Sequence, residues 1–360
     1  MALGLTIGLI WMLQALTGAM LAFEQELDFL TNRDLFEVQE SGAEMSLEEQ
    51  VQLVREQLPE LAKEIYLIGL MDYPGVATLM LAKPAGEAGP KDGVRIFVDP
   101  FAGKIKGVQS YKDSLMGKVY HFHRTLYLGK WGKWITSTSG VLLMGSVLGG
   151  VLVWWARRRN ENSRQERLYR MHLRLGMWFA PIIFIIALNG VLVTYRFAYI
   201  PFLYLVTGSE IPAKIFKPIE IEPRPDHERL SLNRILEIAE EAVPVATHGV
   251  MLEPTDPERP VTVIRRKPGE PRAAGGTFVD IDPYTGEVLD IFDFTEGTAA
   301  ARLTYFTIHL HTGEWGGYFG EAGKLATRIL WCLSALIVVV LGVVGLITFW
   351  RRRRSTDWDR

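Results

Sequence analysis

The chain has 360 residues, of which 48% are hydrophobic and 22% charged, and its formal net charge at pH 7 is −2. Proteins that bind nucleic acid by electrostatic attraction carry a basic excess, so the balance of 39 Lys and Arg against 41 Asp and Glu argues against that class. The single cysteine excludes an intrachain disulfide and a cysteine-ligated metal or iron–sulfur site.

Four apolar blocks are long enough to cross a membrane. Each holds about 20 residues with almost no charge, the length needed for a hydrocarbon core about 30 Å thick. Soluble proteins rarely bury four helices of this length, and the first block lacks the basic flank and cleavage site of a secretory signal peptide. The expected membrane helices are 2–23, 134–155, 175–195 and 327–350.

The arginines predict how these helices are oriented. A dense group occupies the link between the second and third blocks, and four more follow the fourth block. These residues are Arg157, Arg158, Arg159, Arg164, Arg167, Arg170 and Arg174, and then Arg351 to Arg354. Because basic residues collect on the cytoplasmic side, we expect both termini to be cytoplasmic and both long inter-span segments to lie outside, which in a bacterium is the periplasm.

The second half of the chain repeats the first. Ala-Leu-Thr-Gly at 15–18 matches Ala-Leu-Asn-Gly at 187–190, and Tyr-His-Phe-His at 120–123 matches Ile-His-Leu-His at 308–311. Each His-x-His pair precedes an apolar block that ends in Trp and an arginine run. This pattern predicts an internal duplication, and sites in duplicated membrane proteins commonly lie between the repeats.

The two external segments also correspond. An amphipathic helix is expected at 46–58 and at 230–242. Strand-like runs with an Asp-Pro-x-x-Gly turn follow, at 99–103 and 282–286, where proline presets φ and glycine accepts a positive φ. The predicted fold is therefore a membrane α-helical protein with four transmembrane helices, internally duplicated, and two small periplasmic α+β domains.

The segments expected in chain order follow from these patterns. They are helix 1 (1–23), periplasmic domain 1 (24–118), the first His-x-His segment with helix 2 (119–156), the arginine-rich link (157–171), helix 3 (172–200), periplasmic domain 2 (201–304), the second His-x-His segment with helix 4 (305–350) and the cytoplasmic tail (351–360).

Five of the seven histidines lie at the ends of apolar blocks: His121, His123, His172, His309 and His311. Imidazole at a membrane interface serves as a proton relay, a metal ligand or an axial haem ligand. On a helix, residues i and i+2 point about 200° apart and cannot bind one small ion. On a strand they share a face and suit Zn or Cu. Structural histidines bonded to their neighbours are the remaining interpretation.

The other histidines and the start of the chain complete the pattern. His227 and His248 lie in a polar external segment, which predicts solvated surface residues. His172 precedes Gly176 by four residues, and the same offset from Gly4 falls one residue before Met1. We therefore expect a matching histidine immediately upstream of the given sequence. The chain has no Cys-x-x-Cys-His motif, so any haem would be non-covalent b-type.

Several motifs together carry a resemblance to a known family. They are Leu-Thr-Gly at 16–18, His-Phe-His-Arg at 121–124, Ser-Gly-Val-Leu-Leu at 139–143, Trp-Trp-Ala-Arg-Arg at 154–158, Arg-Met-His-Leu-Arg-Leu-Gly at 170–176 and His-Leu-His-Thr-Gly at 309–313. With these motifs, the whole chain resembles the PepSY-associated transmembrane family, which includes inner-membrane siderophore-iron reductases of the ferrioxamine-reductase type in Gram-negative bacteria.

The resemblance implies a reductase of the bacterial inner membrane that passes electrons to a periplasmic ferric-siderophore and releases Fe(II) for iron uptake. It implies two haem b groups, an outer one held between the two His-x-His segments and an inner one at His172 that is short of its upstream partner. The electron donor would be a quinol or a cytoplasmic reductant. The implied axial ligands are His121, His123, His172, His309 and His311, and Arg124, Arg170 and Arg174 would neutralise haem propionates or bind anionic lipid head groups.

Two other classes of function stay open from the sequence. One is a non-catalytic membrane scaffold, in which the PepSY-like domains bind a partner or regulate a protease and the histidines are structural or hold a metal. The other is a permease that carries a siderophore inward, although four spans with few intramembrane charges make a poor solute path.

Overall fold

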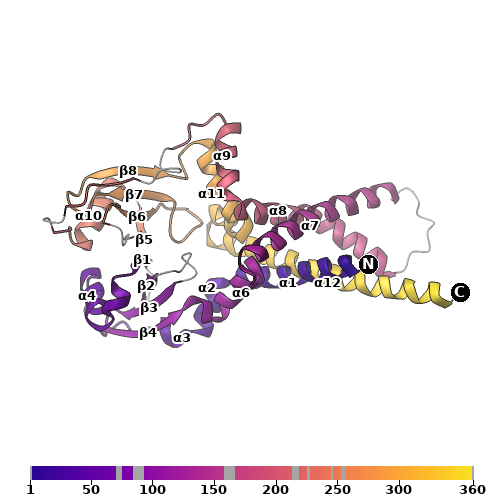
Figure 1. Cartoon of the computed structure of the whole chain (residues 1–360), viewed down its shortest axis with the longest axis horizontal. Coiled ribbons are helices and arrows are strands. Elements are labelled where there is room, and N and C mark those ends of the chain that lie inside the picture. Colours follow the sequence, from indigo (N-terminus) through magenta and orange to yellow (C-terminus); the bar gives the residue numbers. More distant parts are fainter. Residues whose placement is uncertain are drawn as a thin grey trace.

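The computed structural model describes residues 2–69, 75–83, 93–157, 167–212, 219–224, 228–244, 246–252 and 257–358. It has a helical bundle at one end and a β-sheet with its helices at the other (Figure 1). We call the bundle end beside the sheet the sheet end, and the end where the first helix begins the termini end. Arg158, Arg159, Arg164 and His227, and the side chains of Arg157, His248, Arg352, Arg353 and Arg354, lie outside the described residues.

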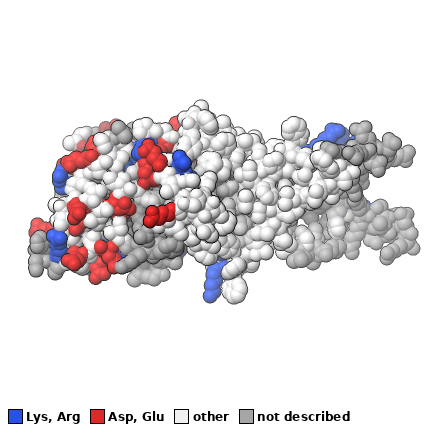
Figure 2. Space-filling model, turned by 90° about the horizontal axis from the view of Figure 1, so that it is seen from above, with Lys and Arg blue, Asp and Glu red and all other residues white. Residues whose placement is uncertain are grey.

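Four helices of the bundle are long and apolar enough to cross a membrane. They are α1 (Ala2–Leu21), α7 (Gly129–Arg157), α8 (Arg167–Thr194) and α12 (Gly320–Trp358). They match the four apolar blocks predicted from the sequence, except that α1 ends at Leu21 and α8 at Thr194, two residues and one residue before the predicted ends. Large apolar side chains such as Leu148 and Trp178 are exposed on their outer surfaces. Figure 2 shows many charged residues over the sheet and an uncharged surface along the middle of the bundle, with a few basic residues towards its ends. The chain is therefore a multi-pass membrane protein.

Each half of the chain has the same order of elements: a spanning helix, a short second helix, an amphipathic helix, four strands, a helix with the His-x-His pair and another spanning helix. Between α1 and α7 these are α2 (Glu24–Thr31), α3 (Arg33–Phe36), α4 (Leu47–Gln57), α5 (Pro59–Ala62), β1 (Ile65–Gly69), β2 (Thr78–Ala82), β3 (Val94–Asp99), β4 (Lys104–Ser110), η2 (Tyr111–Asp113) and α6 (Leu115–Thr125). Between α8 and α12 they are α9 (Arg196–Val206), α10 (Leu232–Ala242), β5 (Thr247–Leu252), β6 (Val261–Arg266), β7 (Thr277–Ile281), β8 (Val288–Asp293), α11 (Ala299–Thr312) and η4 (Glu314–Phe319).

The eight strands form one antiparallel sheet in the order β4-β3-β2-β1-β5-β6-β7-β8. The halves meet where β1 pairs with β5, with Ile68 opposite Met251 and Gly69 opposite Val250. The two α+β units expected from the sequence therefore share one sheet. The physical reason is that β1 and β5 would otherwise leave unpaired backbone groups along two sheet edges.

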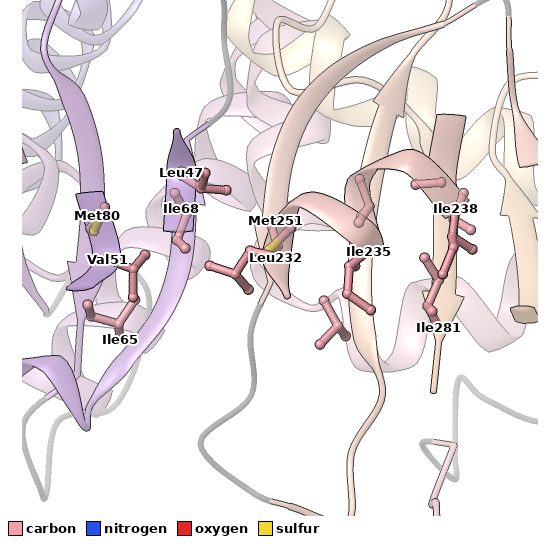
Figure 3. Close-up of a cluster of buried hydrophobic side chains, with 14 of the residues drawn as sticks. Leu47, Val51, Ile65, Ile68, Met80, Leu232, Ile235, Ile238, Met251 and Ile281 are labelled. Carbon is pink, nitrogen blue, oxygen red and sulfur yellow. The ribbon is translucent and has the colours of Figure 1, made fainter. Parts of the chain in front are cut away.

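The amphipathic helices of both halves cover one face of this sheet and share a core. Leu47 and Val51 of α4 and Leu232 and Ile235 of α10 pack with buried strand residues from both halves, including Met251 (Figure 3). The α4 carboxylate of Glu48 also accepts a 2.8 Å hydrogen bond from the backbone N–H of Leu232, the first residue of α10. The sheet is therefore a single unit that holds both histidine helices.

Two polar contacts attach α2 to its surroundings. The buried carboxylate of Asp28 pairs with the buried guanidinium of Arg95 on β3. On the other side, the guanidinium of Arg328 on α12 donates to both carboxylate oxygens of Glu26, at 2.7 and 2.6 Å, and to the backbone carbonyl of Ala22 at 2.7 Å. The sheet and the bundle are therefore joined through α2.

Asp28→Asn is expected to destabilise the protein strongly. Removing one partner of a buried ion pair leaves the charge of Arg95 uncompensated, which costs about 3–5 kcal/mol. The control is Glu60→Gln, which breaks the exposed pair with Lys63 and costs less than about 1 kcal/mol. Thermal unfolding in detergent measures both variants, and equal shifts of the melting temperature would contradict the assigned role of the buried pair.

Candidate functional site

The His-x-His pairs lie at the ends of two short helices at the sheet end of the bundle. In α6, the Ser114 side chain caps the start, and Leu126 ends the helix in the left-handed conformation at φ 48°. In α11, Thr298 caps the start, and Gly313 ends the helix at φ 81°. Both pairs are therefore helical, and the two members of each pair point to different sides, as the i, i+2 spacing predicts.

His123 and His311 face each other across the two halves. Their ring centroids are 6.4 Å apart, with an angle of 45° between the ring planes. Each ring lies against a glycine of a spanning helix: a Cβ at Gly18 would lie 3.2 Å from Cε1 of His123, and one at Gly190 would lie 3.0 Å from Cε1 of His311. Gly18 and Gly190 thus make room for the facing imidazoles.

Neighbouring groups orient both rings. The Thr17 hydroxyl lies 3.0 Å from Nδ1 of His123 and 2.8 Å from the backbone carbonyl of Leu13, so it accepts from Nδ1–H when it donates to that carbonyl. The His311 ring is hydrogen-bonded to the backbone of Ile186. Its buried Nδ1 has no hydrogen-bond partner among the described residues. One bonded and one available nitrogen is the usual state of a metal-ligating histidine.

Burial keeps both facing imidazoles neutral. It lowers the pKa of His123 to about 4, and the neighbouring His311 lowers it further. Burial likewise lowers the pKa of His311 below its ordinary value of 6.5. At pH 7 both rings therefore carry a free lone pair, which is the form that binds a metal.

The other members of the pairs lie in different surroundings. The His309 ring is fully buried, 4.4 Å centroid to centroid from the Tyr305 ring, and its Nδ1 is 3.9 Å from Oε2 of Glu314. His121 is half-buried and contacts the ring of Tyr120 edge-on at 5.5 Å. Of the four His-x-His histidines, His123 and His311 are therefore the two whose rings contact each other across the halves.

A second candidate site is a cavity of about 530 Å³ lined by residues of the four spanning helices towards the termini end. His172 lines it, and its buried Nδ1 has no hydrogen-bond partner among the described residues, while the ring is hydrogen-bonded to the backbone of Leu341. The lining is apolar and rich in glycine, and a Cβ added at Gly4, Gly8 or Gly150 would meet nothing within 4 Å. The volume lies in the range of about 300–1,000 Å³ usual for cofactor pockets.

A family model named PepSY-associated TM region matches residues 1–352. The chain belongs to this family. No curated protein sequence matches it. The family agrees with the four spanning helices. The matched residues include α6 and α11, which carry the His-x-His pairs, and all the strands of the sheet.

In this PepSY-associated TM protein, the side chains of the predicted arginines are exposed. Arg124 is exposed and donates a 3.1 Å hydrogen bond to the hydroxyl of Tyr120. Arg170 and Arg174 are exposed on α8, two residues to either side of His172. The predicted surface residue His248 lies on β5, opposite Arg265 of β6.

Sequence reasoning missed the residues that orient the histidines. In the sequence, Thr17 and Gly18 served only to align the first half with Asn189 and Gly190 of the second half. A glycine at the matching position of both halves could have predicted that another group packs closely there. Sequence reasoning also missed a buried network in which Tyr305 donates to Glu270 at 3.1 Å and the Lys267 backbone N–H donates to the same carboxylate at 3.1 Å. This network ties α11 to the sheet.

The free energy of unfolding of Glu270→Gln, relative to that of the native protein, is expected to increase as the pH rises. Burial raises the pKa of Glu270 above 4.5, so between 4.5 and the raised value the folded chain holds a proton that the unfolded chain has released. The free energy of unfolding therefore falls as pH rises through that interval, and glutamine removes the fall. Melting temperatures measured from pH 4 to pH 8 test this, with the exposed Glu287→Gln as the control; a difference independent of pH would contradict it.

Proposed function

We propose that this protein is an inner-membrane reductase that carries haem b and passes electrons to a periplasmic ferric-siderophore, which releases Fe(II) for iron uptake. Its main support is the way His123 faces His311 at the sheet end of the bundle. Haem b would supply reversible one-electron transfer between Fe(III) and Fe(II) at a potential that its axial ligands set.

His123 and His311 would hold the haem iron between them, and the separation of their rings fits one metal bound by both. Imidazoles bound to a metal at about 2 Å have ring centroids about 6 Å apart when they lie on opposite sides of it. The centroids of His123 and His311 are 6.4 Å apart. Both imidazoles are neutral, and the close approach of Gly18 and Gly190 leaves no side chain between the rings and the spanning helices.

The glycine-lined cavity fits a second haem with one ligand from His172. Among the described residues that line it, His172 is the single histidine, and its unpartnered Nδ1 is buried at the wall. Ligation is thus assigned to His123, His311 and His172. His121 and His309, the other predicted ligands, flank the facing pair, where Tyr120 and Tyr305 hold their rings.

The two sites lie at opposite ends of the bundle, which suits electron transfer across a membrane. Arg157, Arg167, Arg170, Arg174 and Arg351 lie at the termini end, so the positive-inside rule supports a cytoplasmic location for that end and a periplasmic location for the sheet. A quinol or a cytoplasmic reductant would then donate electrons near His172, and the ferric-siderophore would accept them near the sheet.

Removing the proposed ligands is expected to remove haem. Full-length protein purified in detergent should show a Soret band that dithionite shifts, and His123→Ala and His311→Ala should each abolish the haem of one site, because six-coordination needs both imidazoles. His172→Ala should abolish the other, and His248→Ala on the sheet is the control. Haem quantification and the reduced-minus-oxidised spectrum measure these losses.

Native protein with no Soret band, even after haem is added, would overturn the reductase and favour the non-catalytic scaffold. Haem that all three ligand variants retain would overturn the ligand assignment while leaving a haem protein in place. Loss of ferric-siderophore reduction in parallel with haem loss is the expected activity result.

Thr17→Val is expected to weaken haem binding at the facing pair. A hydrogen-bonded neighbour of a ligating histidine fixes its tautomer, and removing such a neighbour typically lowers metal affinity about 10–100-fold. Thr17→Ser should restore the affinity, since it keeps the hydroxyl. Asn189→Ala at the matching position is the control, because Asn189 donates to the backbone carbonyl of Ile185 instead. Haem titration of the apoprotein measures the effect, and equal affinities in Thr17→Val and Asn189→Ala would contradict it.

A further inference from the structure

The short helix α9, which follows α8, is apolar on both faces. Its inner face packs on α11: Leu203 and Tyr204 form a buried cluster with Ala300, and the Tyr199 hydroxyl is hydrogen-bonded to that of Thr307 at 2.7 Å. The side chains on its other face are solvent-accessible in the isolated chain: Phe197 is 72% exposed, Phe202 58% and Leu205 77%, and Val206 is exposed as well. A helix that is apolar all round normally has both faces buried, so the outer face of α9 needs a cover.

The outer face continues the surface of the spanning helices. Residues 167–194 of α8 form a candidate span, and α9 begins two residues later and runs across the bundle axis rather than along it (Figure 1). A row of aromatic rings crosses this junction. The ring centroids of Trp134 on α7 and Tyr195 are 5.6 Å apart, and those of Tyr195 and Phe197 are 6.2 Å apart. Aromatic residues of this kind mark the boundary between lipid and water at helix ends.

The matching helix of the first half differs in character. Helix α2 follows α1 as α9 follows α8, but it carries acidic side chains that other parts of the protein bind. Asp28 pairs with Arg95 and Glu26 with Arg328. The apolar outer face of α9 is therefore particular to the second half and is not a general property of the repeat.

We infer that α9 is an interfacial helix that lies in the membrane surface on the sheet side, with Phe197, Phe202, Leu205 and Val206 inserted among the lipid acyl chains. Its apolar side chains match the acyl boundary, and its position at the end of a spanning helix puts it at that depth. The inner face holds α11, so lipid contact through α9 positions the helix that carries His309 and His311. The inference requires only the membrane setting and is independent of haem.

Site-directed spin labelling tests the location of α9. The chain has one cysteine, so Cys332→Ser gives a background in which Phe202→Cys or Leu205→Cys is the only label site. Leu148→Cys on α7, a position 54% exposed on a spanning helix, is the lipid control, and Ile291→Cys on β8, 45% exposed on the sheet, is the water control. The protein is reconstituted in phosphatidylcholine bilayers, and collision rates with oxygen and with a water-soluble nickel chelate are measured.

Labels at positions 202 and 205 are expected to collide several-fold more with oxygen than with the nickel chelate, as at position 148. A ratio equal to that at position 291 would overturn the inference, because α9 would then lie in water. Labels shielded from both reagents would also overturn it, since a second copy of the chain or another protein would then cover the face. Because the two α9 positions are labelled separately, one variant that fails to fold leaves the other as the test.

Discussion

The pairing of β1 with β5 determines how the two halves of the protein are placed. Three registered residue pairs join these strands, and the core beneath them is shared between α4 and α10. In lipid, apolar surfaces gain little by packing on one another, so the spanning helices have a weak driving force of their own to choose a partner. The sheet lies outside the bundle, where burying apolar surface from water does stabilise a contact. Pairing β1 of the first half with β5 of the second half therefore brings α6 and α11 close together. The facing of His123 and His311 is therefore a consequence of a contact made outside the membrane.

Polar contacts transmit that placement from the sheet to the bundle. Asp28 and Arg95 join α2 to the sheet, and Arg328 joins α12 to the other side of α2. Glu270 and Tyr305 join the sheet to α11. The contacts of Asp28 with Arg95 and of Glu270 with Tyr305 are polar and buried, so they hold one geometry where apolar contacts would allow sliding. A metal site between two helices needs contacts that fix the helices in place, because a displacement of about 1 Å in the ligand positions prevents binding.

Much of this architecture could be predicted from local patterns, and the rest depends on contacts between distant residues. Apolar blocks and their lengths predicted the four spanning helices, and Asp-Pro-x-x-Gly predicted the turns that the structure has at 99–103 and 282–286. Nothing in Ile68 or Met251 indicates that these two residues pair with each other, so the single sheet was missed. The helical state of the His-x-His pairs stayed open, because a short segment of mixed polarity suits a helix or a strand.

The same limit applies within the candidate site. Helical spacing predicted that the two histidines of each His-x-His pair point to different sides of the helix. It did not predict which of the two faces the other half of the chain. Which histidine faces the other half depends on how α6 and α11 are rotated about their axes where they contact the spanning helices. It also depends on Gly18 and Gly190, whose lack of a side chain leaves room for His123 and His311. The two halves then differ in one respect that bears on the proposed chemistry. Thr17 supplies a hydroxyl to His123, whereas Asn189 at the matching position turns to its own helix. Two otherwise equivalent imidazoles thus have unequal hydrogen-bonding neighbours, so they would bind one metal with unequal basicity. The two halves each supply one member of the facing pair, and single-residue differences between the halves give its two sides distinct properties.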